Sequence, residues 1–356
     1  MAGILAEFYL IRAFSVRPVV AAILLICQAV ISIANVYPFD VWLHGAAVFP
    51  AGLLTMWWWS IVPVALVVWL SRWFPAKPFS PGRRKILRSS FQALAAAPAV
   101  ALCTGIIIRK DLVVREVPMK FHNLPKDLQG VRLVQLSDIH IGAFYTAADL
   151  ARAVDAANGL RADVMLITGD LISTRYDPLE ECLQELKRLR ASNGIWGCLG
   201  NHEMHAEIEA HTAKLANQVG IHFLRQENEQ LRFGRARLNL VGVDHQRRER
   251  PYLQHTSELI SPDDFNLLLS HNPDVFPVAA KQGFDLTISG HTHGGQINMD
   301  LLGSHINAVD LVTPFTKGEY HLAKSSLYVN SGLGTIGVPV RLGSPPEVTL
   351  ITLCNF

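Results

Sequence analysis

The sequence predicts an α/β domain preceded by an apolar N-terminal region, and three observations predict it. The 356 residues are 50% hydrophobic and only 17% charged, with a mean hydropathy of +0.23, which is too apolar for a purely soluble protein. The apolar excess is concentrated before about residue 110. From Asp111 onward, short apolar runs alternate with segments of helical periodicity, and such repetition indicates a layered α/β domain. We therefore expect a membrane region over residues 1–110 and an α/β domain over residues 111–356.

Three apolar stretches in the first region are long enough to span a bilayer, namely residues 19–36, 45–70 and 91–108. The third is rich in Ala and weaker, and a buried core helix is its alternative interpretation. No soluble domain flanks the first two, so that alternative is improbable for them. We expect about three transmembrane helices.

Charged residues predict the orientation of these helices. The loop at residues 71–90 carries six Lys or Arg residues, whereas residues 37–44 carry none. Because basic loops stay in the cytoplasm, this loop is expected inside, and everything after the third span outside. Arg109, Lys110 and Arg115, just beyond the third span, count against this orientation.

The basic loop also contains Arg83 and Arg84, followed by a mildly apolar Ala-rich run. This segment resembles an internal twin-arginine export signal, which would make the export machinery a partner. Ordinary anchoring charges are the alternative, and both interpretations predict the same topology. Small residues near Ala99 leave open a cleavage after export.

The second region is expected to alternate between strands and helices. Apolar runs rich in β-branched residues and Leu predict strands, whereas apolar residues recurring every three to four positions predict helices. Strands are expected at residues 131–136, 163–168, 195–199, 238–243, 265–269 and 286–288, with more strand within 327–353, and helices at 145–158, 178–190 and from 201 to about 219.

Polar residues that can bind metals follow directly after these strands. Ligands in α/β folds gather at the carboxyl ends of strands, and residues two apart on extended backbone point the same way. Carboxylate, amide and imidazole ligands together suit a pair of divalent first-row metals, and such pairs stabilise displacement at phosphorus. Each signal is weak alone, but the five segments occur in the required order: Asp138 with His140, Asp170, Asn201 with His202, His271, and His291 with His293.

These segments resemble the signature set of calcineurin-like metallophosphoesterases. The resemblance covers the chain from about Leu112 to the C-terminus, and it implies a four-layer αββα sandwich with two β-sheets. Residues 334–341 and 345–347 are similar to the membrane-tethered or exported bacterial branch. The resemblance is carried by Asp138-Ile139-His140, Gly169-Asp170, Gly200-Asn201-His202-Glu203, Ser270-His271 and Gly290-His291-Thr292-His293.

The resemblance also implies roles for single residues. Asp170 would bridge two divalent ions (Mn, Fe or Zn), and a metal-bridging hydroxide would attack phosphorus in line. His202, which is not a ligand in the family, would stabilise the phosphoryl oxygens or protonate the leaving group. The implied ligands are Asp138, His140, Asp170 and His293 for one ion, and Asp170, Asn201, His271 and His291 for the other.

Further residues are candidates for support or substrate binding. Arg341 could contact phosphate, with a structural surface arginine as the alternative, and His205 is expected to line the cleft. Glu203 and Gln296 are expected to support the ligands. The family often has an acidic residue shortly after Gly-Asp, where this chain has Ser173 and Thr174. Histidines without a motif are interpreted as surface or structural: His211, His222, His245, His255, His305 and His321.

The sequence thus predicts a membrane-anchored, two-metal phosphoesterase acting on phosphomono- or phosphodiesters at the extracytoplasmic side of a bacterial inner membrane. Lipid-linked or envelope-derived esters are its expected substrates, and membrane lipid its expected neighbour. A lipid or nucleotide-sugar-lipid pyrophosphatase of the UDP-diacylglucosamine type is the alternative, and it favours a cytoplasmic site. A non-catalytic membrane scaffold is less compatible with the intact ligand set.

Composition excludes several other classes. The net charge is only +2, and the second region has no basic stripe with interleaved aromatics, so nucleic acid binding is not expected. The five cysteines are odd in number and form no CxxC pattern, so neither a disulfide framework nor a zinc knuckle is indicated.

Overall fold

A computed structural model describes residues 100, 101, 103–247, 251–301 and 304–356. The expected spans at residues 19–36 and 45–70 and the basic loop lie outside these residues. Of the third span, residues 100, 101 and 103–108 are helical. None of the helices in the described part of the chain is long and apolar enough to cross a membrane. The chain divides after Ile108, and the second unit, Arg109–Ile336 with Arg341–Phe356, contains the α/β domain.

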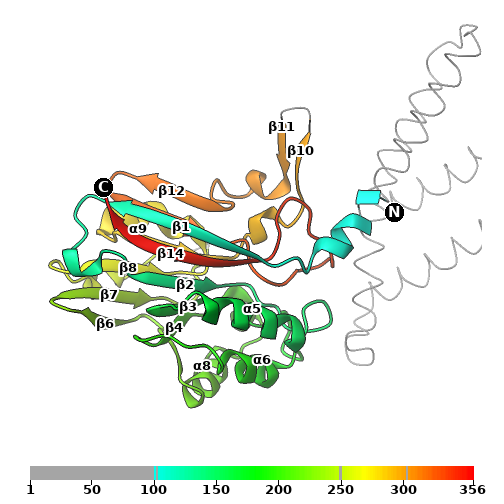
Figure 1. Cartoon of the computed structure of the whole chain (residues 1–356), viewed down its shortest axis with the longest axis horizontal. Helices are drawn as coiled ribbons and strands as arrows, with labels where there is room; N and C mark the ends of the chain where they lie inside the picture. The colour runs from blue at the N-terminus through cyan, green and yellow to red at the C-terminus, as the bar shows by residue number, and fades with distance from the viewer. Residues whose placement is uncertain (1–99, 102, 248–250, 302–303) are drawn as a thin grey trace, which may run out of the picture. The chain divides into compact units, whose positions relative to one another are not determined.

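Two mixed six-stranded sheets form the centre of this domain (Figure 1). The first sheet has the order β1-β14-β2-β3-β4-β5, in which only the pairing of β14 with β2 is antiparallel. Its strands are β1 (Val113–Phe121), β14 (Glu347–Asn355), β2 (Arg132–Leu136), β3 (Val164–Thr168), β4 (Ile195–Cys198) and β5 (Ile221–Phe223).

The second sheet has the order β12-β13-β9-β8-β7-β6, with antiparallel pairs only at its two ends. Its strands are β12 (Gly318–Leu322), β13 (Ser325–Val329), β9 (Leu286–Ser289), β8 (Phe265–Leu269), β7 (Ala236–Gly242) and β6 (Glu227–Phe233). A short hairpin of β10 (Asn298–Leu301) and β11 (Ser304–Asn307) is separate from both sheets.

The side chains of the fully buried strand β3 show the two layers of the core. Val164 and Leu166 pack in the core cluster shared by the two sheets, whereas Met165 and Ile167 pack in the cluster under the helices. Because alternate side chains of a strand point to opposite faces, a strand covered on both faces must be largely apolar. The continuous run of apolar residues is therefore the mark of an inner strand of this sandwich.

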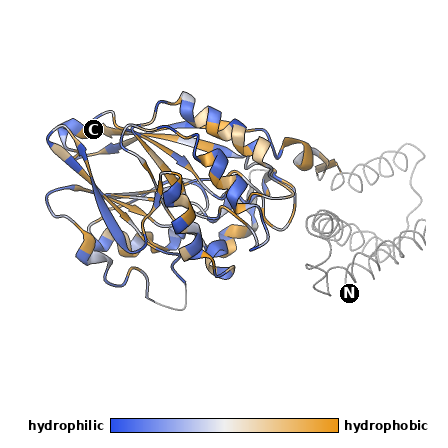
Figure 2. Cartoon of the chain, turned by 90° about the horizontal axis from the view of Figure 1, so that it is seen from below, coloured by the Kyte–Doolittle hydropathy of each residue, from blue (hydrophilic) through white to orange (hydrophobic). Residues whose placement is uncertain are grey.

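Helices cover the outer faces of the sheets. The helices α5 (Ala147–Gly159), α6 (Leu179–Leu186) and α8 (Glu209–Gln218) pack on the first sheet, and α9 (Phe276–Gln282) packs on the second. In Figure 2 these helices carry both hydrophobic and hydrophilic residues, as elements with one face on the core do. The expected α/β class with two sheets is thus confirmed.

Two expected helices differ from the structure. The helix expected from residue 201 to 219 is broken into α7 (Asn201–His205) and α8, because the chain turns at Glu207, whose φ is +58°. The helix expected over residues 178–190 ends at Leu186, although Leu189 still packs in the core.

The topology brings the site loops together. The carboxyl ends of the parallel strands β2, β3 and β4 lie along one edge of the first sheet, as do those of β7, β8 and β9 in the second. Backbone hydrogen bonds tie neighbouring loops, from Asp138 N to Gly169 O and from Gly290 N to His271 O. The five predicted ligand segments follow these strands.

Candidate metal centre

The imidazole nitrogens of two pairs of histidines converge at this edge. His140 Nε2 lies 3.1 Å from His293 Nε2, and His271 Nε2 lies 3.2 Å from His291 Nδ1. Two nitrogens that each lie ~2.0 to 2.1 Å from one cation, at angles of about 90 to 110°, are about 2.8 to 3.4 Å apart. Both pairs fall in this range, so the donor set fits two cations, one at each pair.

Asp170 lies between the two pairs. Its Oδ2 is 3.6 Å from His140 Nε2 and 3.0 Å from His271 Nε2. Asn201 Oδ1 is 3.2 Å from the same His271 Nε2. One carboxylate oxygen of Asp170 can therefore face both positions, as a bridging ligand must.

Asp138 completes the group. Its Oδ1 is 3.5 Å from His293 Nε2, and both carboxylate oxygens accept from the backbone N–H of His291, at 3.0 and 3.1 Å. Ser137 Oγ donates to Oδ2 at 2.6 Å and fixes the rotamer of the carboxylate. The structure thus brings together all seven expected ligands: Asp138, His140, Asp170, Asn201, His271, His291 and His293.

The protonation equilibria show where positive charge is favoured. Burial opposes the charged form of His271, but the Asp170 carboxylate outweighs burial and raises the pKa of His271 to about 10. Burial also opposes ionisation of Asp170, yet the charge on His271 holds the pKa of Asp170 well below its usual range. A proton thus sits where two carboxylates converge, which is where a cation would be favoured.

Other imidazoles are kept neutral, as metal ligands must be. Burial lowers the pKa of His140 to about 3 and that of His291 to about 4. Burial, His140 and the charge of Arg341 lower the pKa of His293 well below its usual range. Burial raises the pKa of Asp138 to about 6, and a bound cation would oppose this change.

Five of the ligand residues adopt a backbone conformation that non-glycine residues avoid. Their φ angles lie in the left-handed region and range from +46° to +75°. Each such residue costs roughly 1 to 3 kcal/mol, and clusters of them occur at functional sites, where the surrounding structure holds them in place. They are Asp138, His140, Asp170, His291 and His293.

Glu203 supports the ligand loops, as the sequence suggested. Its fully buried carboxylate accepts three backbone N–H groups, from Asp170 at 3.0 Å, Leu171 at 2.6 Å and Gly200 at 2.8 Å. These bonds tie the loop after β3 to the loop after β4, so Glu203 fixes the position of Asp170 relative to Asn201.

Ser173 and Asp177 contact the surroundings of the centre, although the sequence analysis assigned them no role. Ser173 Oγ is 3.0 Å from His140 Nδ1, and its carbonyl oxygen is 2.7 Å from His202 Nδ1. Asp177 Oδ2 accepts from the N–H groups of Ser173 at 2.8 Å and Thr174 at 2.6 Å. Asp177, seven positions after Asp170, therefore holds the backbone of the loop that carries Ser173.

His202 lies at the edge of the centre. Its Nδ1 donates to Ser173 O, so its other nitrogen remains available to a ligand or substrate. Its ring packs edge-on against His140, with 4.8 Å between centroids, and its ligand atom groups with those of His140 and Asp170. The geometry is compatible with either a proton donor or an additional metal ligand.

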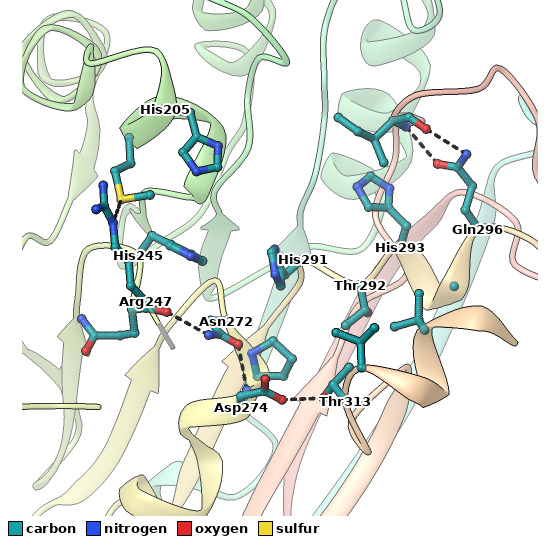
Figure 3. Close-up of a pocket in the computed structure, with 17 residues that line it drawn as sticks. His205, His245, Arg247, Asn272, Asp274, His291, Thr292, His293, Gln296 and Thr313 are labelled. Atoms are coloured by element: carbon teal, nitrogen blue, oxygen red, sulfur yellow. Dashed lines mark hydrogen bonds between the residues drawn. The ribbon is translucent and has the colours of Figure 1, made fainter. Parts of the chain in front are cut away.

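A cavity of about 820 Å³ adjoins the centre and is lined by His291 and His293 (Figure 3). His205, expected to line the cleft, does so. The cavity has polar walls and an apolar side. Its other lining residues are Met204, His245, Gln246, Arg247, Asn272, Pro273, Asp274, Thr292, Gly295, Gln296, Val309, Val312, Thr313 and Ile336.

Arg341 does not lie on the surface, contrary to one interpretation, and it does not line this cavity. It is fully buried, and its guanidinium donates to the carbonyl oxygens of Ser331, Gly334 and Ser344. Its Nη2 is 3.5 Å from His293 Nδ1. In this arrangement it holds the loops behind His293 and presents no surface to a phosphate.

The site and fold define a class of protein, namely metal-dependent phosphoester hydrolases, and comparison with known proteins identifies the family. Residues 131–295 match the family model described as calcineurin-like phosphoesterase. The chain belongs to the calcineurin-like metallophosphoesterase superfamily, whose members use two divalent metal ions.

Several relatives share this domain. The chain is 28% identical over 286 residues to YkuE of Bacillus subtilis, described as an uncharacterized metallophosphoesterase, covering 76% of this chain and 97% of that one. It is 31% identical to a bovine transmembrane protein with metallophosphoesterase domain, covering 67% of this chain but only 56% of the relative. An uncharacterized metallophosphoesterase of Campylobacter jejuni is 32% identical over 243 residues, which cover 67% of this chain and 63% of the relative.

Proposed function

We propose that this chain is a membrane-anchored phosphoesterase that hydrolyses phosphomono- or phosphodiesters with two metal ions and in-line attack of water. The observation that carries the proposal is the position of the Asp170 Oδ2 atom between His140 and His271. Two divalent ions at this centre would supply Lewis acidity and lower the pKa of the attacking water. Mn, Fe and Zn all suit these ligands.

The residues of the chain would perform the remaining tasks. Asp138 and Asp170 supply negative charge that offsets the cations, and Glu203 and Ser173 hold the ligand loops. When protonated, His202 would donate its Nε2 proton to the leaving group, because its Nδ1 proton is already given to the Ser173 carbonyl. The adjoining cavity would accept the ester group of the substrate.

A lipid-linked phosphoester or pyrophosphate is a second candidate substrate. Val309, Val312 and Ile336 form an apolar side of the cavity. Next to them, Leu311 is 91% exposed and Val312 is 59% exposed, so apolar surface adjoins this side of the cavity. An acyl or prenyl chain would cover these side chains.

The experiment is activity profiling of the purified full-length chain in detergent with Mn, Fe and Zn. Phosphomonoesters, phosphodiesters and pyrophosphates would each be offered, with and without a lipid chain. We expect metal-dependent hydrolysis of at least one class, and a lower KM for its lipid-linked form. Absence of hydrolysis with every metal would contradict the proposal, whereas equal KM values would remove only the lipid-linked candidate.

We also propose that the domain faces the extracytoplasmic side of a bacterial inner membrane. The basic loop at residues 71–90 and the apolar stretches before and after it support this orientation. A C-terminal reporter that works only outside the cytoplasm should be active. An active cytoplasmic reporter would refute the orientation and favour the cytoplasmic pyrophosphatase. If Arg83 and Arg84 form an export signal, replacing both by Lys should trap the domain inside.

A further inference from the structure

His245 lies beside the metal centre but belongs to none of the family's ligand segments. It follows β7, an inner strand of the second sheet after which the sequence predicted no ligand. Its ring centroid is 5.4 Å from that of His291 and 5.9 Å from that of His271. The imidazole lines the cavity, on the wall that faces His291 (Figure 3). The interpretation of His245 as a mere surface or structural residue does not explain this position.

Both neighbours of His245 are anchored. Asp244 pairs with Arg225 through hydrogen bonds of 2.8, 3.0 and 3.1 Å. On the other side, the carbonyl oxygen of Gln246 accepts from Asn272 Nδ2 at 2.9 Å. The segment that carries His245 is thus held on both sides. One of the residues that hold it, Asn272, directly follows the expected metal ligand His271. Such fixation holds a side chain ready for a ligand.

The imidazole itself has an unsatisfied polar atom. Within the part of the chain that the structure describes, Nδ1 of His245 is buried and has no hydrogen-bond partner. An unpaired buried polar group is unfavourable, and in native proteins it calls for a functional explanation. Metal binding does not provide one, because His245 is absent from the group of Asp170, His271 and His291, whose ligand atoms all lie within 4.8 Å of one another.

We propose that His245 binds the substrate by donating a hydrogen bond to a non-bridging oxygen of the phosphoryl group. The proposal rests on the proposed function, because it needs a phosphoryl group between the metal centre and the cavity. A group bound at the ions would reach the cavity beside His291, where the His245 ring lies. Donors placed at the phosphoryl oxygens stabilise the charge that develops in the transition state.

The test compares His245→Asn with the matched control His255→Asn in the full-length chain loaded with metal. His255 is exposed and pairs with Glu258, and its φ of +59° is a conformation that Asn tolerates. Three quantities are measured: metal content per chain, the Kd for inorganic phosphate, and kcat and KM for a phosphodiester. We expect unchanged metal content, a Kd for phosphate that rises about tenfold, and a kcat/KM that falls at least as much. The control should match the wild type in all three.

Two results would overturn the proposal. A phosphate Kd within about twofold of the wild type would show that His245 does not touch the phosphoryl group, and a lost metal ion would show that it is a ligand. His245→Gln serves as a second variant, and failure of both variants to unfold cooperatively would show that the residue is structural. Because phosphate binding needs no turnover, a wild type that hydrolyses nothing would refute the proposed function and leave this test intact.

Discussion

Replacing Gly200 by Ala should disrupt the centre although it replaces none of the expected ligand residues. A Cβ at Gly200 would lie 2.6 Å from the backbone N and 2.8 Å from the Cγ of Asp170, and closer still to Oδ1. Since ordinary contact begins at 3.4 Å, Cγ would have to move by about 0.6 Å. The two backbones cannot separate freely, because Glu203 Oε2 accepts from the N–H groups of both Gly200 and Asp170.

This displacement exceeds what a metal site tolerates, since ligand distances vary by only ~0.2 Å. A misplacement of ~1 Å at a catalytic centre costs ~10²-fold in rate. We therefore expect Gly200→Ala to lower kcat/KM roughly 10- to 100-fold and to weaken metal binding, with an overpacking cost of ~1 to 3 kcal/mol in the free energy of unfolding. The φ of Gly200 is −98°, so backbone strain does not contribute.

The assay combines metal titration, steady-state kinetics and chemical unfolding. Gly159→Ala is the matched control, because a Cβ there meets nothing within 4 Å and the residue ends helix α5. This control should retain full activity. If Gly200→Ala binds metal and turns over like the control, the position of Asp170 is not constrained in the way described, and the reasoning fails.

Three further predictions test other parts of the site and fold. His202→Ala should keep its metal content yet lose ~10²-fold or more in kcat, less for good leaving groups, and loss of metal would instead make His202 a ligand. Chelation should lower the melting temperature by roughly 5 to 10 °C, because a cation at ~100 times its Kd stabilises by ~2.7 kcal/mol, and an unchanged melting curve would contradict this. Burial opposes ionisation of Asp149, but hydrogen bonds from Lys110 and Thr146 outweigh it and lower the pKa of Asp149 to about 2. This stabilisation is complete above the unfolded pKa of ~3.9 and is lost as the pH falls through about 2. The difference in the free energy of unfolding between the wild type and Asp149→Asn should therefore shrink as the pH falls through that window. A difference that stays constant with pH would refute this prediction.

The buried part of the fold was predictable from the sequence, whereas its edges were not. Inner strands such as β3 and β8 are fully buried and largely apolar, with Thr168 and Asn266 as their polar exceptions, because both their faces are covered. The outer strands β1, β6 and β12 are exposed along most of their length, so they show no apolar run. The pairing of strands into two sheets is set by contacts far apart in sequence, and only the family resemblance indicated it.

The convergence of the expected ligands was predictable because each ligand segment follows a recognisable strand. The residues that hold them were not, since their roles depend on local geometry. Ser173 and Asp177 act through a loop of irregular conformation, and Arg341 acts from the interior through backbone carbonyls. The left-handed conformation of Asp138 and His140 has no sequence signal either, because it is imposed by the surrounding structure.

The metal content of Asp170→Asn, measured by elemental analysis beside its turnover, tests the central claim most directly. The substitution keeps the shape of the side chain but removes the charge that faces both His140 and His271. We predict two ions per chain in the wild type, and in the folded variant a loss of most metal together with most activity. A variant that retains two ions and hydrolyses at the wild-type rate would contradict the bridging role and, with it, the two-metal mechanism.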